Sequence, residues 1–164
     1  MPLDLTIQLH HPRWKTLLRP YCKTVREACG AALQQMSDNR CQITEMAVVL
    51  ADDDFIHDLN RTYRGKDKAT NVLAFPNESL SSDICYLTSG DAKRHLGDLV
   101  LALETIEREA AEQKKTVKDH VKHLLVHGTL HLLGCDHKRV KDAACMEALE
   151  IKILKTLKVR NPYL

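Results

Sequence analysis

The chain has 164 residues, which is the size of one domain, and its 24 Lys and Arg nearly balance its 22 Asp and Glu. A hydrophobic fraction of 44% excludes the disordered and fibrous classes, and the net charge of +2 neither demands nor excludes a nucleic-acid partner. The longest apolar runs, such as Met46 to Ala51, are too short for a membrane span, and Met1 to Trp14 lacks the apolar core of a signal peptide. We therefore expect one soluble, cytoplasmic domain covering residues 1–164, with no membrane contact.

The cysteines are scattered and form no Cys-x-x-Cys pair. This pattern predicts neither a zinc ribbon nor a disulfide framework, so we expect reduced thiols. The six are Cys22, Cys29, Cys41, Cys85, Cys135 and Cys145.

Apolar periodicity predicts the elements in chain order. Strands are expected at 3–9, 43–51, 72–75 and 97–103. A helix with a kink at Pro20 is expected over 12–36, and a short helix whose N-cap lies in 52–54 is expected to end at about Tyr63. Three further helices are expected at 104–113, 117–133 and 141–157. Residues 77–94 are expected to be irregular. Because strands come first and helices cluster at the end, we expect an α+β fold: a small mixed four-stranded sheet with five or six helices.

Residues 127–137 read His-Gly-Thr-Leu-His-Leu-Leu-Gly-Cys-Asp-His and carry most of the chemical information. On a helix, His127 and His131 lie one turn apart on one face, so both rings can reach one ion. Gly134 allows the chain to turn back, so that His137 can become the third ligand. Three histidine nitrogens leave one open position on a tetrahedral ion, which is typical of a catalytic metal site. We expect this site on the penultimate helix and the turn that follows it.

His123 precedes His127 by one further turn and offers an alternative pair. Residues eight apart are separated by about 12 Å along a helix, so one ion cannot bind His123, His127 and His131 together. We favour the pair that the Gly134 turn follows and interpret His123 as a residue of the helix face. Asp136 either accepts a hydrogen bond from a ligand imidazole or holds the turn, and the sequence does not separate these roles.

The spacing also matches the metzincin protease pattern at every position but one. Those proteases carry a glutamate general base where this chain has Gly128. Because a peptidase of that type needs the carboxylate to protonate the leaving amine, an easier leaving group such as a ribose oxygen fits better.

Residues 60–68 place four cations and a tyrosine in one short, loop-like segment. Arginine binds phosphate oxygens in a bidentate manner, and tyrosine can stack on an unpaired base. On this segment alone, a solvated charged turn is the simpler interpretation. The candidate RNA-binding side chains are Arg61, Tyr63, Arg64 and Lys66.

The two stretches together resemble the YbeY family of bacterial ribosomal-RNA-maturation endoribonucleases. That family pairs an Asn-x-x-Tyr-Arg-x-Lys-Asp segment, followed by Thr-Asp/Asn-Val-Leu-Ser-Phe-Pro, with a His-Gly-x-Leu-His-Leu-x-Gly-Tyr-Asp-His segment. Here they are residues 60–76 and 127–137, while 96–99 is similar to the family's Leu-Gly-Asp-Ile strand and 146–150 to its final helix. The resemblance extends from about Ile43 to Leu157.

The resemblance implies that His127, His131 and His137 bind one metal ion, zinc or another divalent transition metal, and that Arg64 is essential for activity. It also implies single-stranded RNA as substrate, and a role in 3′-end maturation of small-subunit ribosomal RNA and in ribosome quality control. The small ribosomal subunit would be a partner, and we expect a monomer. The departures from the family pattern are Ala69, Ala74 and Cys135, none of which removes a ligand or Arg64.

Two other functions remain open on the sequence. One is a metallopeptidase, which the three-histidine spacing favours and Gly128 disfavours. The other is a non-catalytic ribosome-assembly factor with a structural metal and a basic docking segment. For the enzyme, we expect the ion to polarise a phosphodiester oxygen or supply hydroxide, with Arg64 stabilising the transition-state charge.

Overall fold

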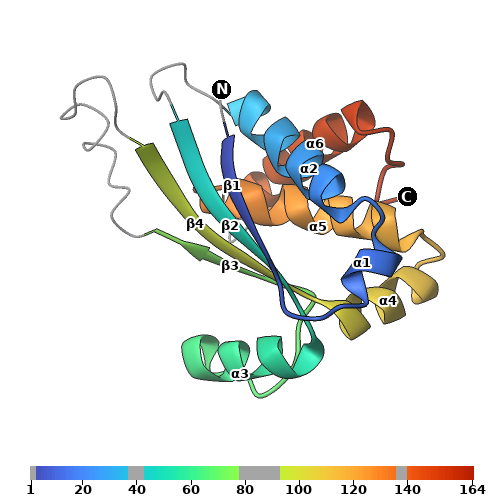
Figure 1. Ribbon diagram of the computed structural model, residues 1–164. Helices are drawn as coiled ribbons and strands as arrows, with labels where there is room; N and C mark the ends of the chain where they lie inside the picture. Colours follow the sequence, from blue (N-terminus) through green and yellow to red (C-terminus); the bar gives the residue numbers. More distant parts are fainter. Residues whose placement is uncertain (1–2, 37–42, 78–92, 136–139) are drawn as a thin grey trace.

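Four strands form one mixed sheet in the computed structural model, which describes residues 3–36, 43–77, 93–135 and 140–164 (Figure 1). The strands are β1 (Leu3–Leu9), β2 (Ile43–Ala51), β3 (Val72–Pro76) and β4 (Lys93–Ala102). Their order in the sheet is β1-β2-β4-β3. The pairs β1–β2 and β2–β4 are parallel, whereas β3 runs antiparallel to β4. The expected mixed four-stranded sheet is therefore confirmed.

Six helices lie in the described part of the chain. They are α1 (Trp14–Leu17), α2 (Tyr21–Met36), α3 (Asp53–Arg64), α4 (Leu103–Glu112), α5 (Val117–Leu132) and α6 (Val140–Thr156). The four helices after β2 begin and end within a few residues of the predicted bounds. The α+β class is confirmed as well.

The single helix predicted over 12–36 is wrong, because the chain forms α1 and α2 with Pro20 between them. Proline has no backbone N–H and its ring clashes with the preceding turn, so α1 ends rather than bends. The carbonyl of Pro20 then accepts the first hydrogen bonds of α2, from the backbone N–H (3.1 Å) and the hydroxyl (3.2 Å) of Thr24.

The strand expected over 97–103 begins earlier, at Lys93, so the predicted irregular segment 77–94 is partly wrong. Backbone pairing accounts for the difference: Lys93 and Arg94 pair in parallel with Ile43 and Thr44 of β2, before a register shift between Glu45 and Ala47. Residues 78–92 of the predicted irregular segment lie outside the described residues.

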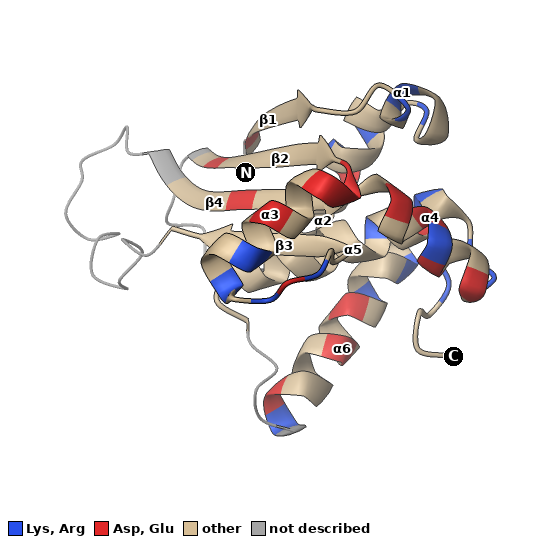
Figure 2. Cartoon of the chain, turned by 90° about the horizontal axis from the view of Figure 1, so that it is seen from below, with Lys and Arg blue, Asp and Glu red and all other residues tan. Residues whose placement is uncertain are grey.

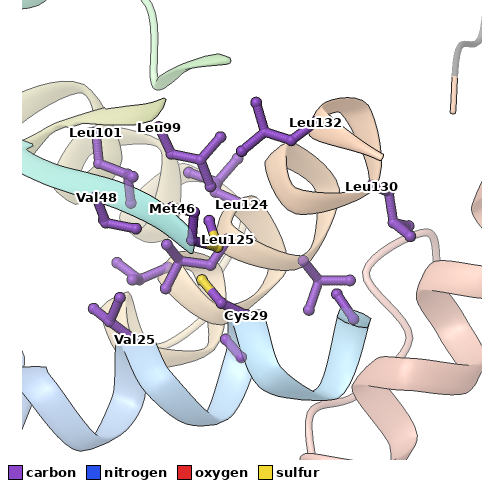
Figure 3. Packing of buried hydrophobic residues seen from close by; sticks show 14 of the residues in the cluster. Val25, Cys29, Met46, Val48, Leu99, Leu101, Leu124, Leu125, Leu130 and Leu132 are labelled. Atoms are coloured by element: carbon purple, nitrogen blue, oxygen red, sulfur yellow. The ribbon is translucent and has the colours of Figure 1, made fainter. Parts of the chain in front are cut away.

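The main core lies between one face of the sheet and the helical layer that contains α2 and α5 (Figure 1). Register places Val48 of β2 beside Leu99 of β4, and both are fully buried. Their side chains meet residues of α2 and α5 such as Cys29 and Leu125 (Figure 3). This packing fixes α5, which carries His127 and His131, against the sheet.

The other face of the sheet is covered by α3 (Figure 1), over a smaller apolar cluster. Its buried members are Ala51, Ile56, Leu73, Val100 and Ala102. The predicted N-cap is confirmed, since Asp52 accepts a 2.9 Å hydrogen bond from the N–H of Phe55. Acidic residues occupy the start of α3 and basic residues its end, as Figure 2 shows, which suits the helix dipole.

Two reciprocal hydrogen bonds, here called the carboxylate exchange, join the starts of α3 and α4. The N–H of Asp53 donates to Glu104 Oε2 (2.8 Å), and the N–H of Thr105 donates to Asp53 Oδ1 (2.9 Å). Each carboxylate therefore satisfies a backbone donor at the start of the other helix, where such donors lack partners within their own helix. This exchange fixes the orientation of α3.

The cysteines that the structure describes are free thiols, as expected; Cys41 and Cys85 lie outside the described residues. Cys29 is fully buried, and burial raises the pKa of its thiol to about 12. It therefore behaves as a small apolar core residue.

None of the helices in the described ranges has the length and apolar character needed to cross a membrane.

Candidate active site

A cavity of about 690 Å³ opens between α5, the end of α3, β3 and the segment after α6. Its walls combine imidazole rings, a guanidinium group and a phenol with small apolar residues. The lining residues are Arg64, Asn71, Val72, Ala74, Pro76, His123, Leu124, His127, Gly128, His131, Gly134, Cys135 and Tyr163. The cavity therefore joins the two stretches that the sequence singled out.

His127 and His131 lie together on the cavity side of α5. Their Nε2 atoms are 3.0 Å apart, and their ring centroids are 4.6 Å apart. The alternative pair is less close, since the ring centroids of His123 and His127 are 6.3 Å apart. The structure thus brings together the pair that the Gly134 turn follows.

The turn after α5 orients His131. Gly134 has a φ of 90°, in the region that favours glycine, and the N–H of Cys135 donates back to the carbonyl of Leu130 (2.9 Å). This places the carbonyl of Cys135 3.0 Å from Nδ1 of His131. Because a carbonyl can only accept, Nδ1 of His131 carries the proton and Nε2 presents its lone pair.

Glu150 of α6 orients His127 in the same way. Its Oε1 lies 2.6 Å from Nδ1 of His127. The carboxylate is fully buried, and its second oxygen accepts hydrogen bonds from His123 Nε2 (3.4 Å) and from the hydroxyl of Tyr163. The sequence reasoning missed Glu150 and Tyr163 as residues of the site.

Two opposing effects set the protonation of Glu150. Burial on its own raises the pKa of this carboxyl group, but hydrogen bonds from His123, His127 and Tyr163 outweigh burial and lower its pKa to about 2. Glu150 is therefore a carboxylate that accepts from Nδ1 of His127, so that Nε2 of His127 presents its lone pair toward His131. In turn, burial and the neighbouring Glu150 charge raise the pKa of Tyr163, which keeps its hydroxyl a donor.

The donor set fits a metal ion such as zinc. Two ligands 2.0–2.1 Å from a tetrahedral ion lie about 3.3 Å apart, close to the observed 3.0 Å between the two Nε2 atoms. A cation bound by both Nε2 atoms would accept both lone pairs at once. Each ring also donates its other nitrogen to an oxygen acceptor, as metal-binding histidines generally do.

The third predicted ligand, His137, and its neighbour Asp136 lie outside the described residues. Within the described ranges alone, no three His, Cys, Asp or Glu side chains converge as a metal site. The ligand set of His127, His131 and His137 and the role of Asp136 therefore stay predictions.

Arg64 is the one predicted RNA-binding side chain that lines the cavity. Its Nη2 donates to the carbonyl of Ala74 on β3 (3.1 Å). Arg61 instead pairs with Asp58 (2.8 Å), and Tyr63 is 68% exposed, with its ring edge against Phe75. Along with Lys66, these residues lie outside the cavity walls.

The description of residues 60–68 as loop-like is partly wrong. Residues up to Arg64 form the last turn of α3, and Gly65 ends the helix with a φ of 64°. Asn60 is buried there, and its side-chain amide donates to the carbonyl of Lys68 (2.8 Å). Arg64 is thus presented by a capped helix end.

Gly128 has a packing reason to be glycine. A Cβ atom at this position would lie 2.8 Å from a methyl group of Leu99, which is fully buried in β4. A Cβ atom here would therefore press on the Leu99 side chain, which would have to move. Gly128 itself lines the cavity, and at the position of the metzincin base it supplies no carboxylate.

Comparison with known proteins identifies the family of the chain. The profile of the family described as Endoribonuclease YbeY matches residues 8–158. A protein named Endoribonuclease YbeY from Magnetococcus marinus is 52% identical over 122 residues, which cover 73% of this chain and 83% of that protein. One of the same name from Rhizobium johnstonii is 43% identical over 169 residues, covering 98% and 93% respectively.

A solved structure shows the same fold at low sequence identity. The solution structure of TM1509 from Thermotoga maritima is similar with a TM-score of 0.53 and 21% identity, covering 94% of this chain and 91% of that one. Fold, cavity and relatives together define an RNA-cleaving hydrolase. The chain belongs to the Endoribonuclease YbeY family.

Proposed function

We propose that the chain is a metal-dependent endoribonuclease specific for single-stranded RNA. It acts as a cytoplasmic monomer on the small ribosomal subunit, in 3′-end maturation of its RNA and in ribosome quality control. Its ion is zinc or another divalent transition metal. The observation that carries the proposal is the pair of facing Nε2 atoms of His127 and His131, 3.0 Å apart, in a cavity that Arg64 also lines.

His127 and His131 would hold the ion, which when bound would supply Lewis-acid chemistry for phosphodiester hydrolysis. The side chains of the chain supply binding and orientation. Arg64 uses one N–H group to hold the carbonyl of Ala74, and its remaining N–H groups can donate to phosphate oxygens in the cavity. Its permanent charge then stabilises the extra negative charge of the transition state.

The leaving group distinguishes RNA from peptide as substrate. A peptide amine must be protonated as it leaves, and Gly128 supplies no carboxylate for that task where metzincin proteases carry their base. A ribose oxygen is a better leaving group, so the lack of a carboxylate at position 128 is compatible with phosphodiester cleavage.

The test compares wild type, His131→Ala and a control, His11→Ala, whose residue does not line the cavity. Each protein is incubated with a labelled single-stranded RNA and with the same RNA as a duplex, and bound zinc is measured on the same samples. We expect wild type and His11→Ala to retain zinc and cleave only the single strand. We expect His131→Ala to lose both zinc and cleavage.

Full cleavage by His131→Ala would contradict the proposal. If all three proteins bind RNA and none of them cleaves it, a non-catalytic assembly factor is favoured. Zinc-dependent turnover of unstructured peptides by wild type would favour the metallopeptidase instead.

A further inference from the structure

The segment after α6 folds back along α5 and reaches the cavity. The N–H of Val159 donates to the carbonyl of Leu154 (2.9 Å), which reverses the chain at the end of the helix. Two lysines then hold the segment: Lys122 Nζ donates to the carbonyl of Leu157 (3.2 Å), and Lys115 Nζ to that of Pro162 (2.8 Å). The position of residues 157–163 is therefore set by the start of α5 and the turn before it.

This path brings Tyr163 to the buried carboxylate. The Tyr163 hydroxyl donates to Oε2 of Glu150, and its ring lies edge-on to His123 with a centroid distance of 5.7 Å. The other oxygen of Glu150 accepts from Nδ1 of His127 at 2.6 Å. A continuous hydrogen-bonded chain thus runs from Tyr163 through Glu150 to His127.

The carboxylate needs all of its donors because it is buried and charged. A buried charge is stable only when it is paired and hydrogen-bonded. Two donors occupy Oε2, and the longer of those contacts, from His123, is 3.4 Å. The Tyr163 hydroxyl is therefore the main fixed donor to Oε2, and it leaves Oε1 directed at His127.

We propose that Tyr163 is a positioning residue: through the carboxylate of Glu150, its hydroxyl fixes the ring orientation and the tautomer of His127. The consequence for metal affinity rests on the proposed function, whereas the positioning is a property of the folded chain alone. Loss of the hydroxyl lets the carboxylate turn to satisfy Oε2 elsewhere, and the ring of His127 follows it.

The test uses Tyr163→Phe, which keeps the ring and removes the hydroxyl. The matched control is Tyr21→Phe, the same change on α2, away from the cavity walls. The first measurement is the imidazole ¹⁵N spectrum of chelator-treated protein, with His127 assigned by comparison with His127→Asn. We expect Tyr163→Phe to shift and broaden the His127 signals, and Tyr21→Phe to leave them unchanged.

The second measurement is zinc affinity by chelator competition, with kcat and KM on single-stranded RNA. Loss of a group that orients a metal-binding histidine costs about 10–100-fold in affinity, and we expect the lower end, about tenfold, because Tyr163 acts through Glu150. We expect kcat to fall and KM to change little.

The outcomes separate this inference from the proposed function. Unchanged His127 signals in Tyr163→Phe would overturn the positioning role of Tyr163. The same holds if Tyr163→Phe only lowers the unfolding temperature and leaves both the His127 spectrum and the zinc affinity as in wild type. If wild type binds no zinc while the His127 signals still respond to Tyr163→Phe, the proposed function fails and the positioning role stands.

Discussion

The guanidinium of Arg64 donates to the carbonyl of Ala74 over 3.1 Å, which ties the last turn of α3 to strand β3. Gly65 ends the helix directly after it and turns the chain away. The cation is therefore held at the cavity wall by a helix end and a strand, rather than carried on a free loop. Its neighbour Arg61, one turn earlier, pairs with Asp58 outside the cavity walls.

Arg64→Ala is expected to slow cleavage of single-stranded RNA by about 10²–10³-fold, because a charge that stabilises the transition state is lost. Single-turnover cleavage rates measure the effect. Arg19→Ala is the matched control, since Arg19 is also an arginine that donates to a backbone carbonyl, that of Lys15, and does not line the cavity. Wild-type rates in Arg64→Ala would show that Arg64 has no such role.

Glu150→Gln is expected to weaken zinc binding by about 10–100-fold, because the amide replaces the carboxylate that accepts from Nδ1 of His127. Competition with a chelator of known affinity measures the change. Glu112→Gln, at an exposed position of α4, should bind zinc as wild type does. Equal affinity in Glu150→Gln would mean that the contact does not support the histidine pair.

His120 should make the fold sensitive to mild acid. Burial lowers the pKa of this imidazole below its ordinary value, and hydrogen bonding to Glu109 (2.8 Å) opposes the shift only in part. The folded chain therefore keeps His120 neutral where the unfolded chain binds a proton. Its contribution to stability is complete above about pH 6.5 and is lost as the pH falls toward the lower folded-state pKa.

Urea unfolding at pH 7.5, 6.5 and 5.5 tests this dependence. The unfolding free energy of wild type should decrease as the pH is lowered. This one proton accounts for at most about 1.4 kcal/mol per pH unit. His120→Gln should be less stable at pH 7.5 but show a flatter pH profile, whereas His11→Gln should follow wild type. Parallel profiles for wild type and His120→Gln would contradict the assignment.

Gly97→Ala is expected to destabilise the fold by about 3 kcal/mol. Gly97 has a φ of 126°, and a Cβ atom there would lie 2.1 Å from the carbonyl oxygen of Phe75 on the paired strand β3. Gly30→Ala is the contrasting change, since a Cβ atom within α2 meets nothing and should stabilise the helix by up to about 1 kcal/mol. Equal unfolding free energies for the two variants would contradict this account.

Local patterns predicted most of the fold. Alternation over 3–9 and 43–51 and helical spacing in 117–133 identified strands and helices because each element buries one face. The error at Pro20 came from treating proline as a kink, although its missing N–H ended α1. The early start of β4 at Lys93 depends on pairing with β2, which local sequence does not encode.

The histidine pair was also predictable, because i and i+4 positions share a helix face. The role of Glu150 was not predictable, because its contact with His127 joins two different helices, α6 and α5. A single glutamate in a helix usually faces solvent. One signal existed: Glu150 falls on the buried stripe of α6 with Met146 and Ile153. Tyr163 had none, because its position depends on how residues 157–163 fold back along α5.

The carboxylate exchange between α3 and α4 has a consequence for substitutions far from any RNA. Arg64 stands at the far end of a helix whose first residue is Asp53, and twelve residues of helix extend for about 18 Å. Because Asp53 and Glu104 each bind the start of the other helix, we expect substitution of either residue to tilt α3 and to displace Arg64 at the end of that helix. Random mutagenesis selected for altered RNA cleavage should therefore return changes at Asp53 and Glu104, although neither residue lines the cavity.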